Sequence, residues 1–379
     1  MRVAHFGKYA FTKIGGVERH VRELTCALAA CGIDVTVFSY NVSGGDESSI
    51  VEGVRVESVP VLKTFNSQAI APKLATRARK LAREKKFDVV HQHWPDPFAH
   101  LAAMAISGKP AYVVTWHSDI VRQRALGAVY RKFASQVMVR PNAIIGATKA
   151  HLKSEQMQWF APMERRHVIP FGIDVRRFEP SESRMRDANA LRAKYGGSPL
   201  IFALGRHVYY KGFDVLIRAM ERVPAVLLLG SDGPLTMELR KIASGSRGRV
   251  EFIGPIAEHE LPSYYYASSV FCLPSVATTE AFGLVQAEAL ACGRPVVNTY
   301  LGNGVNELAP HNVCAVTVPP ANEKLLAEAL CSLLAEPARA EKLGLEGRRR
   351  VIAQFSVDVM VQQTIKLYES VVDENAIRK

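Results

Sequence analysis

The chain has 379 residues and a formal net charge of +12, and 48% of its residues are hydrophobic. A globular chain of this length is expected to form two domains of ordinary size. No run of about 18 apolar residues occurs, so no transmembrane helix is predicted, and Met1–Phe6 has the pattern of a strand rather than of a signal peptide.

Cysteine usage and charge distribution suggest a compartment and a kind of partner. The six cysteines form no Cys-x-x-Cys pair and most lie in apolar surroundings, which predicts reduced thiols and a cytoplasmic protein.

Nearly all of the excess positive charge falls in residues 1–175. Such an asymmetry favours a negatively charged partner near that half: anionic lipid, a pyrophosphate-linked acceptor or nucleic acid.

Short apolar runs with strand character alternate with helical runs almost throughout. The predicted strands of the first half are Val3–Phe6, Val35–Ser39, Val89–Gln92, Tyr112–Thr115 and Ala143–Ala147. Those of the second half are Leu200–Leu204, Ala225–Leu229, Val250–Phe252, Val270–Leu273 and Pro295–Thr299. This alternation predicts one parallel sheet with crossover helices in each half. The breaker-rich segment 170–180 is the predicted hinge.

The most informative stretch is Thr279–Leu290, which follows the predicted strand Val270–Leu273 and opens a helix at Gly283. Glu280 then precedes the helix, and Glu288 lies about a turn and a half into it. Unpaired backbone N–H groups at a helix start favour phosphate. Carboxylates beside them can accept hydrogen bonds from sugar hydroxyls, so the arrangement suits a sugar nucleotide.

The spacing Glu-x-Phe-Gly-x-x-x-x-Glu at residues 280–288 resembles the signature of the retaining glycosyltransferase family 4, which has the GT-B fold. The resemblance covers essentially the whole chain. It implies an α/β protein with two Rossmann-like doubly wound domains that face a central cleft. The implied parts are an acceptor-side domain at 1–172, a nucleotide-sugar donor domain at 173–355, and a C-terminal helix at 356–379 that crosses back to the first domain.

On the donor side, Arg206 and Lys211 follow the predicted strand Leu200–Leu204, and cations near a helix start bind anions. The resemblance implies that both hold the donor diphosphate and stabilise the departing nucleotide, which makes them catalytic candidates. It also implies that Glu280, a further catalytic candidate, orients the donor sugar, and that Glu288 binds the ribose. The remaining donor-binding candidates in this half are Gly230, Ile253, Phe282, Gly283 and Leu284, although the loop after Gly230 fits a plain turn equally well.

On the acceptor side, Gly15 and Gly16 separate the first strand from a helix and are donor-binding candidates, with a simple turn as the alternative. His117 resembles the family histidine that contacts the donor sugar, and it is the fourth catalytic candidate. Asp119 is a candidate for positioning the acceptor.

Strand alternation puts His91 and His93 on one face, which suits zinc, but no third ligand is obvious from the sequence. We therefore predict no bound metal. His93 and Trp94 are instead predicted to pack in the fold and also to be acceptor candidates at the rim of the cleft, where the indole of Trp94 would stack on a sugar.

A predicted helix at 73–86 carries seven cations and has one apolar face. It is either a solvated helix or a contact to an anionic membrane surface at the inner face of the cytoplasmic membrane. A second basic group follows His117, and its members are Arg122, Arg124, Arg131 and Lys132.

The predicted function is transfer of a hexose, with retention, from a nucleotide diphosphate sugar to a hydroxyl of a glycan or lipid-linked acceptor in cell-surface polysaccharide biosynthesis. The amino-acid sequences of residues 206–212 and 280–286 resemble those of bacterial enzymes of this kind. The resemblance makes GDP-mannose the leading candidate for the donor, and a UDP-linked sugar the second candidate. The donor is a substrate, and no cofactor is predicted. The chain has no Asp-x-Asp motif, which agrees with metal-independent transfer.

Two alternatives remain open at this point. One is a GT-B sugar-nucleotide epimerase, which would need no acceptor. The other is a non-enzymatic basic protein that binds membrane or nucleic acid. The sequence has no RNA-binding motif, so nucleic acid is not expected as a partner.

Overall fold

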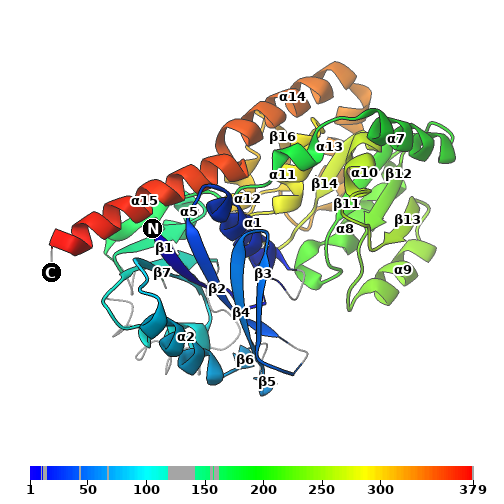
Figure 1. Cartoon of the computed structure of the whole chain (residues 1–379). Helices are drawn as coiled ribbons and strands as arrows, with labels where there is room; N and C mark the ends of the chain where they lie inside the picture. The colour runs from blue at the N-terminus through cyan, green and yellow to red at the C-terminus, as the bar shows by residue number, and fades with distance from the viewer. Residues whose placement is uncertain are drawn as a thin grey trace. The chain divides into compact units, whose positions relative to one another are not determined.

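The computed structural model describes residues 1–9, 11, 15–41, 44–65, 68–117, 141–153, 157 and 162–377. Contacts between residues separate two compact units: unit 1 comprises Met1–Gly172 and Val357–Lys379, and unit 2 comprises Ile173–Ser356. Each unit contains its own largely parallel sheet covered by helices (Figure 1), so the predicted α/β class is confirmed. No helix within the described ranges has the length and hydropathy needed to cross a membrane.

The main sheet of unit 1 has the strand order β10-β9-β8-β7-β1-β2-β4-β3. Neighbouring strands are parallel except β3 and β4, which form an antiparallel pair at one edge. The strands are β1 (Arg2–Phe6), β2 (Asp34–Asn41), β3 (Glu47–Val51), β4 (Val54–Pro60), β7 (Val89–Trp94), β8 (Ala111–Trp116), β9 (Ala143–Gly146) and β10 (Arg166–Val168). A separate ribbon pairs β5 (Lys63–Phe65) with β6 (Gln68–Ile70).

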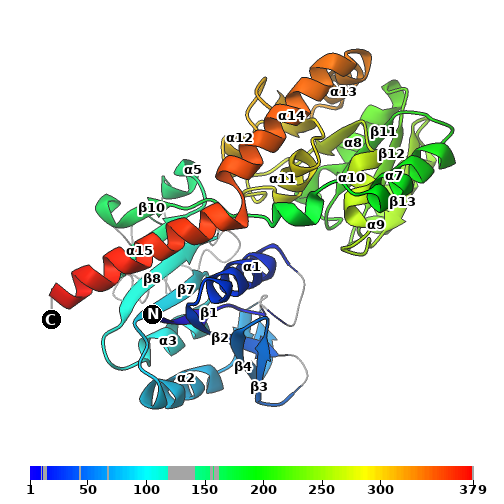
Figure 2. The ribbon, with the colours of Figure 1, turned by 45° about the horizontal axis from the view of Figure 1, so that its top comes forward.

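Helices cover both faces of this sheet, because each presents an apolar stripe to it. On one face, α1 (Gly16–Ala30) and α15 (Val357–Ile377) pack over the strands, and the shared core includes Leu24 and Tyr368. On the other, α2 (Lys73–Glu84) and α3 (Pro97–Met104) complete a second cluster (Figure 2). Among its described residues, unit 1 also has the short helix α5 (Lys149–Leu152) and the 3-10 turn η1 (Met163–Arg165).

Unit 2 has an all-parallel sheet with the order β13-β12-β11-β14-β15-β16. Its strands are β11 (Leu200–Leu204), β12 (Val226–Gly230), β13 (Arg249–Gly254), β14 (Val270–Leu273), β15 (Val296–Thr299) and β16 (Ala315–Val318). Its α-helices are α7 (Glu182–Lys194), α8 (Phe213–Ala219), α9 (Thr236–Ser244), α10 (Leu261–Ala267), α11 (Leu284–Ala291), α12 (Gly304–Leu308), α13 (Glu323–Ala335) and α14 (Pro337–Gln354). The 3-10 turns are η2 (Val175–Phe178), η3 (Tyr209–Lys211) and η4 (Met220–Arg222).

Every strand predicted from the sequence is present, with ends that differ by no more than one or two residues. The expectation of purely parallel sheets is wrong for unit 1, because β3 and β4 form a hairpin that the sequence analysis did not identify. The edge strands β10 and β16 were also not predicted.

The packing of α15 within unit 1 predicts that substitutions on its buried and exposed faces differ in their effect on stability. Met360 is 1% exposed, whereas Lys366 lies on the exposed side of the same helix. Met360→Ala should lower the free energy of unfolding by about 2–5 kcal/mol, because it leaves a cavity in the core. Lys366→Ala should change it by less than about 0.5 kcal/mol. Urea denaturation of the two variants measures the difference, and equal effects would contradict the packing of α15.

Candidate functional site

The main candidate residues of unit 2 lie at the point where the order of strands in its sheet reverses. From β11 the chain proceeds outward through β12 to β13, and then returns to place β14 on the other side of β11. Open α/β sheets bind ligands at such a reversal, outside the carboxyl ends of the two strands involved. In unit 2 these are the ends of β11 and β14.

Lys211 and Glu280 meet at this position as an ion pair. The distance between Lys211 Nζ and Glu280 Oε2 is 2.5 Å, and the two side chains are only 10% and 11% exposed. The hydroxyl of Ser275 donates to the same carboxylate oxygen at 3.3 Å. An ammonium group has three N–H donors, so one ion pair leaves donor capacity for an anionic ligand.

Glycine at position 212 allows the loops after β11 and β14 to approach each other. Gly212 has φ of +66°, and a Cβ there would collide with the carbonyl oxygen of Pro274. The loops are also joined directly, since the backbone N–H of Val276 donates to the carbonyl of Tyr210 at 2.8 Å. This close approach brings the side chain of Lys211 to the loop that carries its partner.

Arg206 directly follows Gly205, where a Cβ would lie 3.1 Å from Lys211 Nζ, and the loop after β12 packs on the same segment. The side chain of Arg206 is exposed, and it forms no ion pair with any residue that the structure describes. Its neighbour His207 is buried, and its Nδ1 lies 2.8 Å from the hydroxyl of Thr236. A Cβ at Gly233 would lie 2.6 Å from the backbone nitrogen of His207, so the predicted glycine-containing loop packs directly on the loop of Arg206.

The second carboxylate of the motif is deeply buried. Glu288 is 1% exposed, and its Oε2 accepts a hydrogen bond of 2.7 Å from the hydroxyl of Tyr265 on α10. The sequence gives no signal for Tyr265, because no local pattern links residues on two different helices. The role of Glu288 toward a ribose stays a prediction.

The other donor-side candidates are backbone positions around these groups. Gly283 precedes α11 with φ of +69°, and a Cβ there would lie 2.7 Å from a methyl group of Leu273. Phe282 is buried, and its ring centroid lies 5.9 Å from that of Phe355. The remaining three are Gly230 at the end of β12, Ile253 within β13 and Leu284 at the start of α11.

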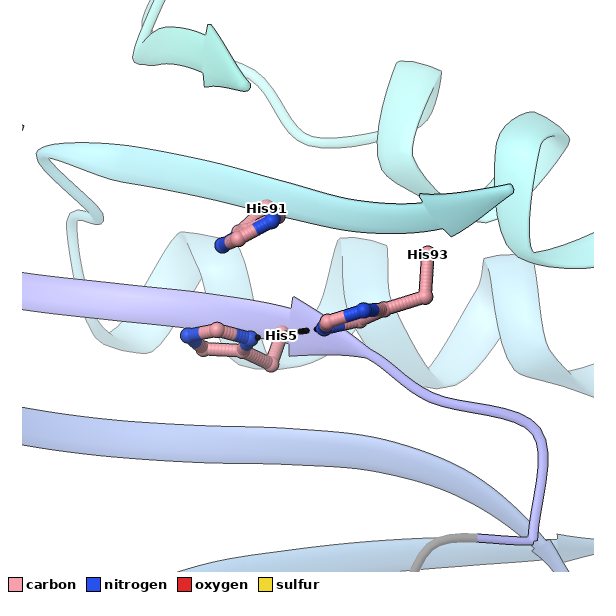
Figure 3. Close-up of side chains that lie close together, drawn as sticks. All are labelled: His5, His91 and His93. Atoms are coloured by element: carbon pink, nitrogen blue, oxygen red, sulfur yellow. Dashed lines mark hydrogen bonds between the residues drawn. The ribbon is translucent and has the colours of Figure 1, made fainter. Parts of the chain in front are cut away.

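Unit 1 brings together five buried histidines. His5 lies on β1, His91 and His93 on the neighbouring strand β7, His20 on α1, and His117 directly after β8. Figure 3 shows the rings of His5, His91 and His93 close together over the two strands. The other two rings extend the group, since the centroids of His20 and His117 are 5.2 Å apart and those of His93 and His117 are also 5.2 Å apart.

A continuous hydrogen-bonded chain runs through most of this cluster. His117 Nε2 lies 2.9 Å from His93 Nδ1, and His93 Nε2 lies 3.2 Å from His5 Nδ1. His5 Nε2 then lies 3.2 Å from the hydroxyl of Tyr368, which is 2.5 Å from His91 Nδ1. The last link joins His91 Nε2 to the Thr115 hydroxyl at 2.7 Å.

Burial keeps these imidazoles neutral. Burial, with a smaller contribution from His20, lowers the pKa of His5 to about 3, and burial lowers the pKa of His20 to about 3. Burial is also the main cause that lowers the pKa values of His91, His93 and His117 well below the usual value. The sequence analysis found only His91 and His93 as a pair, because the other members come from separate segments.

Two further predictions for unit 1 can be compared with the structure. Trp94 is 1% exposed, and its ring stacks on Trp116 with centroids 5.1 Å apart. The prediction that Trp94 stacks on a sugar at a cleft rim is therefore wrong, because a buried indole has no free face. His93 is likewise buried, at 2% exposure.

Other predicted residues of unit 1 are less informative. Gly15 and Gly16 stand at the start of α1, and a Cβ at Gly16 would meet no atom within 4 Å. Asp119 and the second basic group lie outside the described residues. In the basic segment, three cations form ion pairs: Lys73 with Asp46, Arg77 with Glu57 and Lys85 with Asp34.

Comparisons with known proteins cover both units. Residues 14–177 match the family model described as Glycosyltransferase Family 4, and residues 198–336 match Glycosyl transferases group 1. The chain is 26% identical to the O-antigen chain mannosyltransferase C of Escherichia coli, over 99% of this chain and 100% of that protein. It is 30% identical to the D-inositol 3-phosphate glycosyltransferase of Xylanimonas cellulosilytica, over 93% and 91%. Its fold is similar to that of a sucrose-phosphate synthase from Thermosynechococcus elongatus, with a TM-score of 0.78, 24% identity, and coverage of 98% and 99%.

The histidine cluster predicts a loss of stability in mild acid. The unfolded chain binds protons below a histidine pKa of about 6.5, whereas folded His5 and His20 stay neutral down to about pH 3. The free energy of unfolding should therefore fall as pH decreases from about 6.5 to 4, by about 1 kcal/mol per pH unit for each such histidine. Urea denaturation at several pH values measures this slope. A His20→Phe variant should show a smaller slope, and an unchanged slope would contradict the assignment.

Proposed function

The chain belongs to glycosyltransferase family 4, and on that premise we propose that it transfers a hexose, with retention, from GDP-mannose to a hydroxyl of a glycan or lipid-linked acceptor. The mannosyl donor is supported by the likeness to the O-antigen chain mannosyltransferase C, which extends over the full length of both chains. The same likeness supports a place for the reaction in cell-surface polysaccharide biosynthesis.

The observation that carries the proposal is the ion pair between Lys211 and Glu280 at the reversal of the unit 2 sheet. The ammonium group of Lys211 has N–H donors for the diphosphate, and Arg206 adds an exposed cation nearby in the same unit. Negative charge grows on the diphosphate as the sugar leaves, so cations fixed beside it stabilise the transition state more than the ground state.

Glu280 orients the hydroxyls of the donor sugar and does not act as a nucleophile. Its Oε2 accepts from both Lys211 and Ser275, and a carboxylate oxygen held in this way has reduced nucleophilicity. The bond between the anomeric carbon and the phosphate oxygen breaks as the acceptor oxygen bonds to the same face of that carbon. The acceptor proton passes to the leaving phosphate, which gives retention without a covalent enzyme intermediate. His117 remains the candidate of unit 1 for a contact to the substrate.

Removal of either member of the ion pair should lower turnover strongly. Lys211→Ala and Glu280→Ala should each reduce kcat by on the order of 10²-fold, because each acts on charge or orientation in the transition state. The measurement is release of GDP from GDP-mannose, with and without a sugar acceptor. A folded variant with a near-native rate would remove that residue from the proposed machinery.

A double variant and a matched control sharpen this test. The double variant Lys211→Ala/Glu280→Ala should lose less activity than the product of the two single losses, because either substitution already disrupts the shared arrangement. Arg218→Ala serves as the control, since it breaks an exposed ion pair with Asp214 on the adjacent helix α8. It should leave kcat within about twofold, as expected for a weak surface pair.

Metal independence gives a separate prediction. The donor diphosphate is proposed to be neutralised by Lys211 and Arg206 rather than by a divalent cation. Transfer should therefore persist after treatment with EDTA. Full loss of transfer that is restored by Mg²⁺ or Mn²⁺ would contradict this part of the proposal.

A further inference from the structure

The proposed sugar transfer does not explain the environment of His20, one of the buried histidines of unit 1. Neither ring nitrogen of His20 has a hydrogen-bond partner among the residues that the structure describes, although the side chain is only 3% exposed. A buried polar group without a partner is costly. A ligand for His20 would remove this cost.

The surroundings of His20 indicate what such a ligand is. One ring nitrogen from each of His20, His93 and His117 lies within 4.8 Å of one from each of the others. Three imidazoles that converge from separate elements are typical of sites for transition-metal dications, and oxygen ligands of the kind that Mg²⁺ and Ca²⁺ prefer are absent from this set. We infer that His20, His93 and His117 form a binding site for Zn²⁺ or a similar transition-metal ion.

The spacing of the nitrogens is close to that of a zinc complex. Tetrahedral zinc with Zn–N bonds of about 2.0–2.1 Å holds its nitrogen ligands about 3.3 Å apart. His93 Nδ1 and His117 Nε2 already face each other at 2.9 Å. A small rotation of either ring would open the pair to the spacing that the metal requires. The three side chains are 2–5% exposed, and the fourth coordination position would be taken by water.

The hydrogen-bonded chain beyond His93 is compatible with this role. In one of its two possible directions, His93 Nε2–H donates to His5 and His5 Nε2–H donates to Tyr368. The hydroxyl of Tyr368 then donates to His91. In this direction Nδ1 of His93 keeps its lone pair and points at His117, as a metal ligand must. Metal binding would select this direction without breaking any hydrogen bond beyond His93.

The neighbouring group of His5, His91 and His93 is a weaker candidate. Both nitrogens of His91 are engaged, one by Tyr368 and the other by Thr115. Both nitrogens of His5 are also engaged, by His93 and Tyr368. A metal ion there would have to displace these bonds, whereas a metal ion at His20, His93 and His117 would displace only the bond between His93 and His117.

Metal titration of the full chain tests the site directly. After treatment with EDTA and desalting, the protein should bind one equivalent of Co²⁺ with the visible absorption of a tetrahedral complex, and Zn²⁺ should displace it. His20→Phe should weaken Zn²⁺ binding by at least about 100-fold, because it removes one of three ligands. His167→Phe is the matched control, since His167 is a partly buried histidine of unit 1 outside the cluster, and it should bind as the unaltered chain does.

Two further variants keep the test decisive if His20→Phe fails to fold. His117→Gln should weaken Zn²⁺ binding as strongly as His20→Phe. Tyr368→Phe should weaken it about 10-fold, because it breaks the hydrogen-bonded chain that orients His93. The inference is overturned by less than one equivalent of bound metal, by folded His20 and His117 variants with native affinity, or by a loss confined to a His91→Asn variant.

The metal site has a consequence that rests on the proposed function. Zinc held by His117 would withdraw that imidazole from the substrate, so Zn²⁺ should inhibit sugar transfer in the unaltered chain. The ratio of rates with and without Zn²⁺ should return toward one in His20→Phe. Metal binding without inhibition would leave the site intact and contradict the role of His117. Absence of metal binding would contradict the site and leave the transfer reaction untouched.

Discussion

Parallel strand pairing is the constraint on which both candidate sites depend. Parallel strands end at the same edge of a sheet, so loops far apart in the sequence meet there. In unit 2 this brings Lys211, after β11, to Glu280, after β14. In unit 1 it places His5 of β1 beside His91 of β7, with His117 following the next strand. The same reversal of strand order therefore assembles a charged group in one unit and a neutral imidazole group in the other.

The two groups differ in charge because their surroundings differ in exposure and in hydrogen-bond partners. Lys211 and Glu280 keep slight exposure and neutralise each other, and the hydroxyl of Ser275 supplies another hydrogen bond to the carboxylate. Such a pair is stable when nearly buried only if its remaining hydrogen-bonding groups are satisfied, which suits a site completed by a ligand. Among the residues that the structure describes, no carboxylate forms a hydrogen bond with the five clustered histidines of unit 1, so burial holds them neutral. Neutral imidazoles are suited to bind metals and to transfer protons, whereas an ammonium group with free N–H donors is suited to bind anions.

Local patterns in the sequence are sufficient for most of the long buried strands but not for the contacts between them. Apolar runs such as Leu200–Leu204 and Val270–Leu273 identify buried parallel strands because both faces are covered. The hairpin of β3 and β4 lacks this signal, since alternate residues of β3 are exposed. The edge strands β10 and β16 have only three and four residues, which is too short for a clear strand pattern.

For the site residues too, local patterns identify individual residues but not the contacts between them. Glu280 and Lys211 were each found from their motifs, but their direct pairing depends on the close approach at Gly212, which no pattern encodes. His5 and His20 carry no motif, and only the fold brings them to His93. The sequence predicts packing and a cleft-rim role for Trp94, and only the packing is confirmed, because Trp116 on the adjacent strand buries the indole.

The central claim is that unit 2 binds a nucleoside diphosphate at Lys211 and Glu280. The most direct measurement is thermal unfolding in the presence of GDP, UDP, dTDP and ADP, each at about 1 mM, the upper end of usual substrate KM values. A ligand that binds only the folded state raises the melting temperature in proportion to its occupancy. We expect a saturable increase with GDP that Lys211→Ala removes. No increase with any of the four nucleotides, or an equal increase in the Lys211 variant, would contradict it.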